Sequence, residues 1–316
     1  MNKNMILAVG GGGLSAVASM AFLAGTPGAL LFAYLAALPI FLIGFSLGPV
    51  TATVAGLSGF VIAGLFGGVI AAGMFGLVHA LPAWLVSRQS LLQTQASNGR
   101  TIWYPVGSIL GSLSLFCAGL LGALGLFLMG SVESLPGMIS EYLNEAFSFM
   151  APGLTSVELE GMIAMLVSFF PGAMGTSWVL MLVVNALLAQ SVLVRLEKNL
   201  RPSPRFVDLT LPQWLAWPMV IMAAVGLLAS GDVRYIAQNT AIVLAVPYFF
   251  LGLSVVHWAV RRLAFSTPLL VTFYLVLFIS TWALLLVAAL GMAEQWAGLR
   301  SRFSTDRPDD HSHTTN

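Results

Sequence analysis

The sequence predicts an all-α fold, a polytopic bundle of transmembrane helices with eight or nine spans. Hydrophobic residues make up 58% of the 316 residues and charged residues only 8%, whereas soluble domains have about 25% charged residues. No Asp, Glu, Lys or Arg occurs between Asn4 and Ser87. The long apolar runs are the third observation, because about 20 helical residues cross the hydrocarbon core of a bilayer.

Prolines mark several of the predicted span starts, since proline is tolerated in the first turn of a helix and disruptive further along. They are Pro27, Pro49, Pro105, Pro171 and Pro212. The apolar stretch 49–87 is too long for one crossing at 1.5 Å per residue, and its predicted turn is Gly67-Gly68. The predicted spans cover residues 5–24, 28–47, 49–66, 68–87, 105–130, 172–195, 212–230, 236–260 and 266–291.

Basic residues in the short loops predict which ends of the spans face the cytoplasm. With these spans, the basic loop residues and the N-terminus fall on one side, which is predicted to be cytoplasmic. The residues are Lys3, Arg88, Arg100, Arg195, Lys198, Arg201, Arg205, Arg261 and Arg262.

The connection 131–160 has the opposite charge. It contains five Glu residues and no Lys or Arg, which agrees with an external position. Within it, the segment SLPGMISEYLNEAFSFM at 134–150 is typical of an amphipathic helix lying at the membrane interface.

The C-terminal end is compatible with two span counts. Nine crossings place the tail outside, and this is our working count, although Arg300 and Arg302 lie close to the last span and favour the inside. Eight crossings place it inside, in which case one predicted span is re-entrant. We predict a single transmembrane domain over residues 1–295 and a polar, disordered tail over residues 296–316.

The sequence contains no catalytic signature. HExxH, a Walker loop and GxSxG before a helix are all missing, and the GGGG at 10–13 has no strand before it. The single cysteine, Cys117, excludes an intramolecular disulfide and a multi-cysteine metal site. A net charge of +1 without a long basic run gives no indication of nucleic-acid binding. We therefore expect a protein that is not an enzyme and has no metal or cofactor.

Few ionisable side chains lie within the predicted spans, where they are costly and are functional candidates. His79 and His257 are in apolar runs, and both are near predicted cytoplasmic ends. The expected role of each is a hydrogen bond to a neighbouring helix or a side chain that reaches the interface.

Asn185 lies in the middle of the predicted span 172–195, with Trp178 seven residues earlier on nearly the same helix face. An Asn in hydrocarbon requires a partner, and an interhelical hydrogen bond there contributes about 0.6 kcal/mol. Asn185 is therefore either a packing contact between helices or a ligand contact in a cavity. Gln190 is closer to the end of the span and is expected at the interface.

Pro171-Gly172 is predicted to break the helix after the short apolar run 162–170. Broken helices at membrane depth are tolerated where protein or water satisfies the backbone, and substrate sites often use them. The alternative is a segment on the membrane surface that meets the span at a bend. Pro171, Trp178 and Asn185 are the candidate ligand-binding residues.

Small residues recur at intervals of four, a spacing that lets helix backbones approach closely. They are Ala29, Ala33 and Ala37, then Gly64, Gly68, Ala72, Gly76 and Ala80, and Gly107 with Gly111. The pattern predicts a tightly packed bundle. The same face serves packing inside one chain or contact with a partner, and the candidate partner face is Ala29, Ala33, Ala37, Gly68, Ala72 and Gly76.

Three stretches carry a resemblance to a known family: residues 38–88, the pair FFPGAMGTSW and NALLAQSVLVR, and GMAEQWAGLRSR at 291–302. Together they resemble the YybS-like family of bacterial membrane proteins, domain of unknown function 2232. The resemblance covers most of the chain and implies a bacterial inner-membrane protein.

That family is distantly similar to the substrate-binding subunits of energy-coupling factor vitamin transporters. The turn Leu47-Gly48-Pro49 and the Gly-rich stretch after it carry the similarity. In those subunits an Ala-xxx-Ala helix face docks on the transmembrane coupling subunit, a role that the similarity would give to Ala29, Ala33 and Ala37. This chain departs from the pattern, because it has more predicted spans and residues 196–316 have no counterpart.

Three functions follow as hypotheses. The first is a small-molecule-binding subunit of a transporter, with its site near Pro171, Trp178 and Asn185. The second is a non-catalytic scaffold or partner protein in envelope or cell-shape assembly. The third, a membrane enzyme, is disfavoured because acids are scarce in the spans. The expected partners are the lipid bilayer and either a small polar ligand or another membrane protein.

Overall fold

The computed structural model describes residues 2–129, 134–150 and 156–305, and most of them are helical. The chain divides into two compact units. Unit 1 holds residues 1–204 and 216–244, and unit 2 holds residues 205–215 and 245–316. The predicted all-α class is confirmed, whereas the predicted domain boundary at residue 295 stays a prediction.

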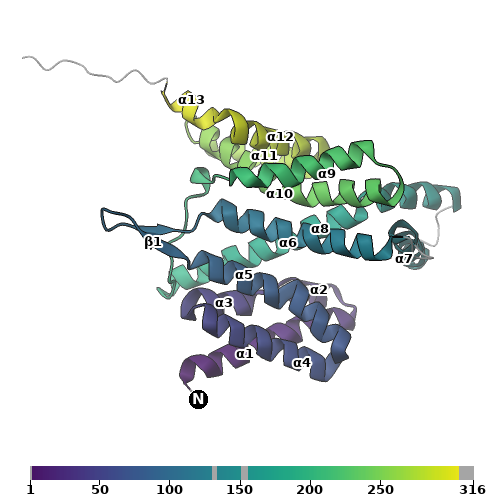
Figure 1. Ribbon diagram of the computed structural model, residues 1–316, viewed down its shortest axis with the longest axis horizontal. Coiled ribbons are helices and arrows are strands. Elements are labelled where there is room, and N and C mark those ends of the chain that lie inside the picture. Colours follow the sequence, from purple (N-terminus) through teal and green to yellow (C-terminus); the bar gives the residue numbers. More distant parts are fainter. Residues whose placement is uncertain (1, 130–133, 151–155, 306–316) are drawn as a thin grey trace, which may run out of the picture. The chain divides into compact units, whose positions relative to one another are not determined.

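Unit 1 contains most of the helices and one small β-hairpin (Figure 1). Its elements are α1 (Lys3–Met20), η1 (Ala21–Ala24), α2 (Pro27–Tyr34), α3 (Leu38–Leu47), α4 (Pro49–Phe75), η2 (Gly76–Ala80), α5 (Leu81–Ser90), β1 (Gln93–Gln95), β2 (Thr101–Trp103), α6 (Val106–Leu128), α7 (Leu135–Met150), α8 (Ser156–Arg195) and α9 (Ala216–Leu228). Helix α10 (Gly231–Val260) begins in unit 1 and ends in unit 2. The other elements of unit 2 are η3 (Phe206–Asp208), η4 (Gln213–Leu215), α11 (Ser266–Ile279), α12 (Thr281–Ala297) and α13 (Leu299–Thr305).

Six helices of the described residues are long and apolar enough to cross a membrane, and a bent pair of helices is a seventh candidate. The predicted number was eight or nine, and two stretches explain the difference. Pro49–Ser90 counts as one candidate of 42 residues although it folds back on itself, and the apolar helix Gln213–Leu228 is shorter than the others. A polytopic helical bundle is confirmed by either count.

Residues 49–90 form what we call the N-terminal hairpin, with its turn at Gly68. Gly68 has φ +79° and ψ −177°, a backbone conformation that is essentially restricted to glycine. On the two sides of this turn, Gly64 faces Ala72 and Phe60 faces Gly76. The predicted turn at Gly67-Gly68 is thus confirmed, and the small residues allow the two arms to lie close together.

Three predicted helices differ from the structure. The span 28–47 is divided into α2 and α3 by a turn at 35–37, where the Ser15 hydroxyl of α1 donates to the Ala36 carbonyl. The span 266–291 is also divided, because α11 and α12 meet at Ser280 with a bend of 116°. We call residues 266–297 the C-terminal hairpin. The predicted break at Pro171 is wrong, since α8 runs without interruption from Ser156 to Arg195.

The loop between α5 and α6 contains an antiparallel β-hairpin that the sequence analysis missed. Gln93 pairs with Trp103 and Thr94 with Ile102. Gly99 has φ +76°, and the Asn98 side chain accepts a hydrogen bond from the Arg100 amide at 3.1 Å. An Asn-Gly pair between short extended segments is the usual sequence signal for such a turn.

Two of the predicted basic loops meet in unit 1. The Arg201 guanidinium donates to the Ser90 carbonyl at 3.1 Å and lies 5.7 Å from the centre of the Trp103 ring. The Leu200 amide donates to the carbonyl of Phe45, near the end of α3. The chain ends of α3, α5 and α8 therefore lie close together in unit 1.

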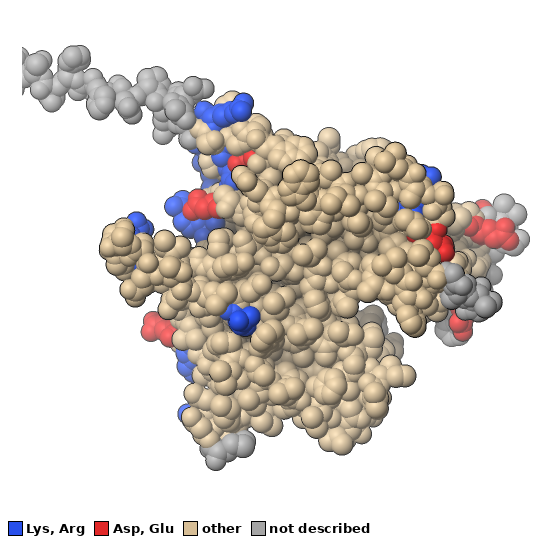
Figure 2. Space-filling model, viewed as in Figure 1, with Lys and Arg blue, Asp and Glu red and all other residues tan. Residues whose placement is uncertain are grey.

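The predicted amphipathic helix is present as α7, at the other end of α6 from the β-hairpin (Figure 1). In unit 1, Figure 2 shows Lys and Arg near the β-hairpin, Asp and Glu near α7, and a mostly uncharged surface over the helices between them. A helix of 23 residues such as α6 rises about 34 Å. This length matches a bilayer of about 30 Å between the two charged ends.

Candidate functional site

Pro171 lies inside α8, and two side chains of α10 form hydrogen bonds with the backbone of α8 around it. Proline has no N–H, so in a helix the carbonyl four residues earlier loses its donor. Here that carbonyl belongs to Val167, and the Tyr235 hydroxyl donates to it at 2.6 Å. Tyr235 thereby replaces the missing hydrogen bond and explains why α8 continues through the proline.

Asn239, one turn after Tyr235, completes the same contact. Its amide oxygen accepts from the Gly172 amide at 2.8 Å and its amide nitrogen donates to the Ser168 carbonyl at 3.1 Å. Ser168 and Gly172 are four residues apart, so Asn239 bridges the two groups that normally bond to each other in a helix. The Asn239 side chain is fully buried. The sequence analysis missed this residue, although Tyr235 and Asn239 at i and i+4 on one helix face were a usable signal.

Trp178 contacts a different element. Its indole nitrogen donates to the Val78 carbonyl at 2.9 Å, and its ring lies 6.0 Å from that of Phe116. Val78 belongs to the single π-helical turn η2 of the N-terminal hairpin. Such turns interrupt the regular pattern of backbone hydrogen bonds and are frequent at functional sites.

Asn185 contacts a third element. Its amide nitrogen donates to the carbonyls of Tyr34 and Met181, both at 2.7 Å. The side chain is 1% exposed, and its oxygen has no hydrogen-bond partner among the described residues. The Tyr34 hydroxyl, in turn, is 2.8 Å from the Ser177 hydroxyl of α8. Asn185 therefore holds α8 against the end of α2 while one buried acceptor remains available.

The part of α8 around Pro171, the Trp178 side chain and the Asn185 side chain thus contact three different parts of unit 1: α10, η2 and α2. Gln190 donates to the Arg201 carbonyl at 2.9 Å in the basic loop, and its position at the membrane interface stays a prediction. The predicted role of Pro171, Trp178 and Asn185 in ligand binding stays a prediction. What the structure adds is that Trp178, Asn185 and the residues around Pro171 take part in contacts between elements.

The two histidines differ in their environment. His79 is buried in η2, with its ring centre 6.0 Å from that of Phe75. In unit 2, the His257 Nε2 atom is 2.7 Å from the Tyr274 hydroxyl, and its ring packs edge-on against Phe206 at 5.5 Å. The described residues contain no group of three His, Cys, Asp or Glu side chains able to hold a metal ion.

The candidate partner face is not one continuous surface. Ala29 is buried, Ala33 is half-buried and Ala37 lies in the turn before α3 rather than on the face of α2. Gly68 is exposed at the hairpin turn, whereas Ala72 and Gly76 pack against the opposite arm. Whether any of them contacts a partner protein stays a prediction.

A groove runs between the two arms of the N-terminal hairpin, with a volume of about 450 Å³. It is lined by Ala52, Thr53, Gly56, Leu57, Phe60, Gly73, Gly76, Leu77, Ala80, Leu81 and Trp84. At one end the Trp84 indole donates to the Thr53 hydroxyl at 2.9 Å, and the Arg88 guanidinium lies 5.7 Å from the Trp84 ring centre. The groove is otherwise apolar, and Leu57, Phe60 and Leu77 in its wall are exposed.

Gly73 is the informative residue in this groove. A Cβ atom added there would meet no atom within 4 Å, so packing of the hairpin does not require a glycine at this position. Gly76 is different, because its added Cβ would lie 3.2 Å from the Phe60 ring. The smallness of Gly73 therefore keeps the groove open without contributing to contacts between the arms.

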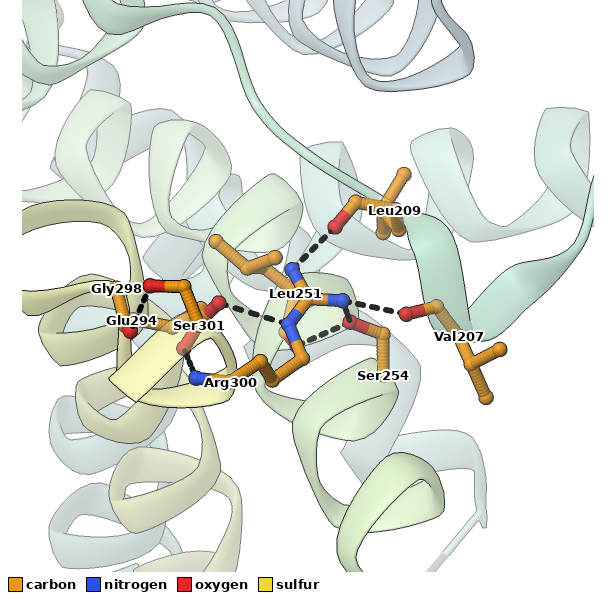
Figure 3. Close-up of polar contacts among 8 residues, drawn as sticks. All are labelled: Val207, Leu209, Leu251, Ser254, Glu294, Gly298, Arg300 and Ser301. Atoms are coloured by element: carbon orange, nitrogen blue, oxygen red, sulfur yellow. Dashed lines mark hydrogen bonds and ion pairs between the residues drawn. The ribbon is translucent and has the colours of Figure 1, made fainter. Parts of the chain in front are cut away.

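Unit 2 contains a buried ion pair, Glu294–Arg300, that the sequence analysis did not identify (Figure 3). The two side chains are 8% and 12% exposed, and Arg300 Nε is 2.7 Å from Glu294 Oε1. The backbone amide of Arg300 also donates to Glu294 Oε2 at 3.1 Å. Gly298, with φ +58°, ends α12 in the left-handed conformation typical of helix ends and turns the chain back toward Glu294.

The remaining donors of Arg300 bind the segment 205–211. One terminal nitrogen donates to the Leu209 carbonyl at 2.7 Å, and the other donates to the Val207 carbonyl and the Ser254 hydroxyl. Arginine is suited to this role because it presents five N–H groups in a rigid plane. We call these contacts the C-terminal latch, since they hold the end of α12 to the chain that follows the basic cluster 195–205.

Comparison with known proteins identifies a family. The family model described as predicted membrane protein (DUF2232) matches residues 13–294. The chain belongs to this family, as the resemblance in the sequence implied, and it is a membrane protein with several candidate transmembrane helices. Neither the search of curated proteins nor the search of solved structures gives a match. The similarity to energy-coupling factor subunits stays a prediction.

Proposed function

We propose that this member of the DUF2232 family is a non-catalytic membrane subunit that binds a transmembrane helix of a partner protein in the groove of its N-terminal hairpin. The observation that supports the proposal is the open space at Gly73, which the fold of the hairpin does not use. The groove lies on helices that are apolar enough to be embedded in a bilayer. A ligand for this groove therefore reaches it from within the membrane.

The lining favours a helix as the ligand. Gly73 is the small residue at which the groove is open, whereas Ala52, Gly56 and Ala80 in its lining are buried in contacts within the chain. In membranes, where apolar side chains gain little by leaving lipid, helices associate through close packing at such small residues. Leu57 and Leu77 on the groove wall offer side chains for the flanks of the incoming helix.

A photoreactive amino acid in place of Leu77, 44% exposed in the groove wall, tests this proposal in native membranes. We expect a cross-link to one membrane protein, and we expect Gly73→Leu to abolish it by filling the groove. The matched control is Gly122→Leu in α6, since a Cβ at Gly122 also meets no atom within 4 Å. This control should leave the cross-link intact.

The same experiment distinguishes the alternatives. Cross-links to lipid alone, or a protein cross-link that persists in Gly73→Leu, would show that the groove does not bind a partner helix. Circular dichroism of both glycine variants in detergent checks that they are folded. In the transport interpretation the partner is a coupling subunit, and in the scaffold interpretation it is another envelope protein, so sequencing the cross-linked partner separates the two.

A second candidate function, binding of a small polar molecule, is favoured by the Asn185 side-chain oxygen. This buried acceptor has no hydrogen-bond partner among the described residues, and a buried acceptor without a donor costs about 1–3 kcal/mol. A ligand N–H or O–H at this position would remove that cost. Binding of this kind agrees with the role that the sequence suggests for Asn185.

Native mass spectrometry of the gently extracted protein tests this second candidate. The expected result is a stoichiometric small molecule that is lost in Asn185→Leu and retained in Asn144→Leu, which removes an exposed Asn of α7 that bonds only within its own helix. If wild-type protein carries lipids alone, or if both variants keep the molecule, Asn185 is a packing residue only.

A further inference from the structure

The C-terminal hairpin has a geometry that the length of its sequence does not suggest. Residues 266–291 are long enough for one span, but the chain bends by 116° at Ser280. Helices α11 and α12 have 14 and 17 residues. At 1.5 Å per residue they rise about 21 and about 26 Å, which is less than the bilayer core of about 30 Å.

Both ends of this hairpin are held near the same segments of unit 2. At its exit, Arg300 binds the carbonyls of Val207 and Leu209. At its entrance, Arg262 donates to the Phe303 carbonyl at 3.4 Å. The segment 205–211 also contacts the end of α10, where the Phe206 and His257 rings are 5.5 Å apart. The chain just before the hairpin therefore contacts the chain just after it, beside the segment that follows the basic cluster 195–205.

The corner of the hairpin is apolar and uncovered. Phe278, Ile279 and Trp282 are 91%, 81% and 76% exposed. Large apolar side chains at such exposure are costly in water, by roughly 25 cal/mol for each Å² of apolar surface. They are favourable in hydrocarbon, and Trp is frequent at the depth where hydrocarbon meets the head groups.

We propose that α11 and α12 form a re-entrant hairpin that enters and leaves the bilayer on the side of the basic loops, with its corner at Phe278, Ile279 and Trp282 inserted in the lipid. The ligand of this surface is the hydrocarbon of the bilayer itself. The inference does not depend on the proposed function of the groove. It selects eight crossings over nine, and it places Arg300 and Arg302 on the side that the distribution of basic residues favours.

The chain is convenient for testing this arrangement because Cys117 is its single cysteine and is buried. In a Cys117→Ser background, Arg302→Cys and Phe303→Cys report on the exit of the hairpin. Asn98→Cys in the β-hairpin and Tyr142→Cys in α7 mark the two faces, at opposite ends of α6. Each variant is treated with a membrane-impermeant maleimide in right-side-out and in inverted vesicles.

We expect Arg302→Cys and Phe303→Cys to react only in the vesicles in which Asn98→Cys reacts. If they react together with Tyr142→Cys, the hairpin is a broken span and the proposal is wrong. It is equally wrong if Asn98→Cys and Tyr142→Cys react from the same side, since the basic loops then do not define one face.

Insertion of the corner is measured with a nitroxide on Phe278→Cys in liposomes. We expect its relaxation to respond to oxygen, which concentrates in lipid, and only weakly to a water-soluble nickel complex. Leu263→Cys, at the entrance of the same hairpin and 54% exposed, is the matched control and should respond to the nickel complex. A strong nickel response at Phe278→Cys would show that the corner lies outside the hydrocarbon.

Discussion

The two hairpins of this protein solve the same problem, reversing an apolar chain, in different ways. In the N-terminal hairpin, Gly68 adopts a conformation open to glycine alone and the arms pack against each other along small residues. In the C-terminal hairpin, Ser280 has φ −117° and ψ 111°, which any residue adopts. There α12 packs instead on the part of α10 that lies in unit 2, where a Cβ at Gly291 would overlap the Tyr248 carbonyl.

The difference shows which features make a hairpin span a membrane. The first arm of the N-terminal hairpin, residues 49–67, rises about 28 Å, close to the bilayer core of about 30 Å. Small residues on both arms keep the two spans together in lipid. The C-terminal hairpin has shorter arms and a wide corner, and its position depends on the latch at its end. Stability should therefore depend on the turn in one hairpin and on the latch in the other.

The largest effect is expected from Glu294→Gln in the C-terminal latch. The substitution keeps the shape of the side chain and leaves the Arg300 guanidinium without its counter-charge. Removing one partner of a buried ion pair typically costs 3–5 kcal/mol, and we expect about 3 kcal/mol here because both side chains retain slight exposure. Unfolding in detergent micelles followed by circular dichroism measures this loss.

Arg205→Ala is the matched control for the latch, because Arg205 and Asp208 form an ion pair with side chains that are 77% and 62% exposed. Exposed pairs contribute little to stability, so this variant should unfold like the wild type. Equal stability of Glu294→Gln and the wild type would mean that the latch does not hold the end of α12.

Gly68→Ala should have the next largest effect, on the N-terminal hairpin. A Cβ at Gly68 meets no atom within 4 Å, so any destabilisation comes from the backbone conformation alone. A residue with a side chain in this region costs about 1–3 kcal/mol, and we expect about 2 kcal/mol in the same unfolding experiment. An unchanged midpoint would indicate that the turn relaxes to a conformation open to alanine.

These two sites also illustrate what sequence reasoning achieves and where it stops. The turn at Gly67-Gly68 follows from local chemistry, because an apolar run of that length must reverse and adjacent glycines allow it. The spans and the basic face follow similarly from hydropathy and charge. The latch depends on Arg300 reaching carbonyls more than ninety residues earlier in the chain, and no local pattern predicts such a contact.

Pro171 shows the same limit inside α8. From sequence, a proline and a glycine in a row predict a break. The helix continues because Tyr235 and Asn239, on another helix, bond to the groups that the proline leaves unpaired. The tendency of proline and glycine to break a helix is outweighed here by contacts with another helix. The sequence does not show which distant residues will make those contacts.

Gly73→Ala should produce a smaller effect of opposite sign. Gly73 lies in the regular helix after the turn, and a Cβ there meets no atom within 4 Å. Glycine inside a helix is less stable than alanine by about 0.5–1 kcal/mol, so the variant should be more stable than the wild type by that amount. Together with Gly68→Ala, this variant separates two reasons for glycine in the hairpin: a special backbone conformation at Gly68 and open space at Gly73. A loss of stability in Gly73→Ala would show that the groove floor packs against its own chain.

Ser280→Ala should have the smallest effect. The backbone at Ser280 is extended, a conformation that alanine adopts without strain, and the side chain is half-buried. We expect a change within about 0.5 kcal/mol, the usual range for substitutions away from special contacts. Because the corner is formed by an ordinary residue, we expect its angle to be set by contacts outside the corner. Gly291 of α12 and Gly252 of α10 pack where these two helices meet, and the latch holds the end of α12. If Ser280→Ala instead destabilises the protein as much as Gly68→Ala, the corner is itself a structural turn, and the contrast between the two hairpins reduces to their length.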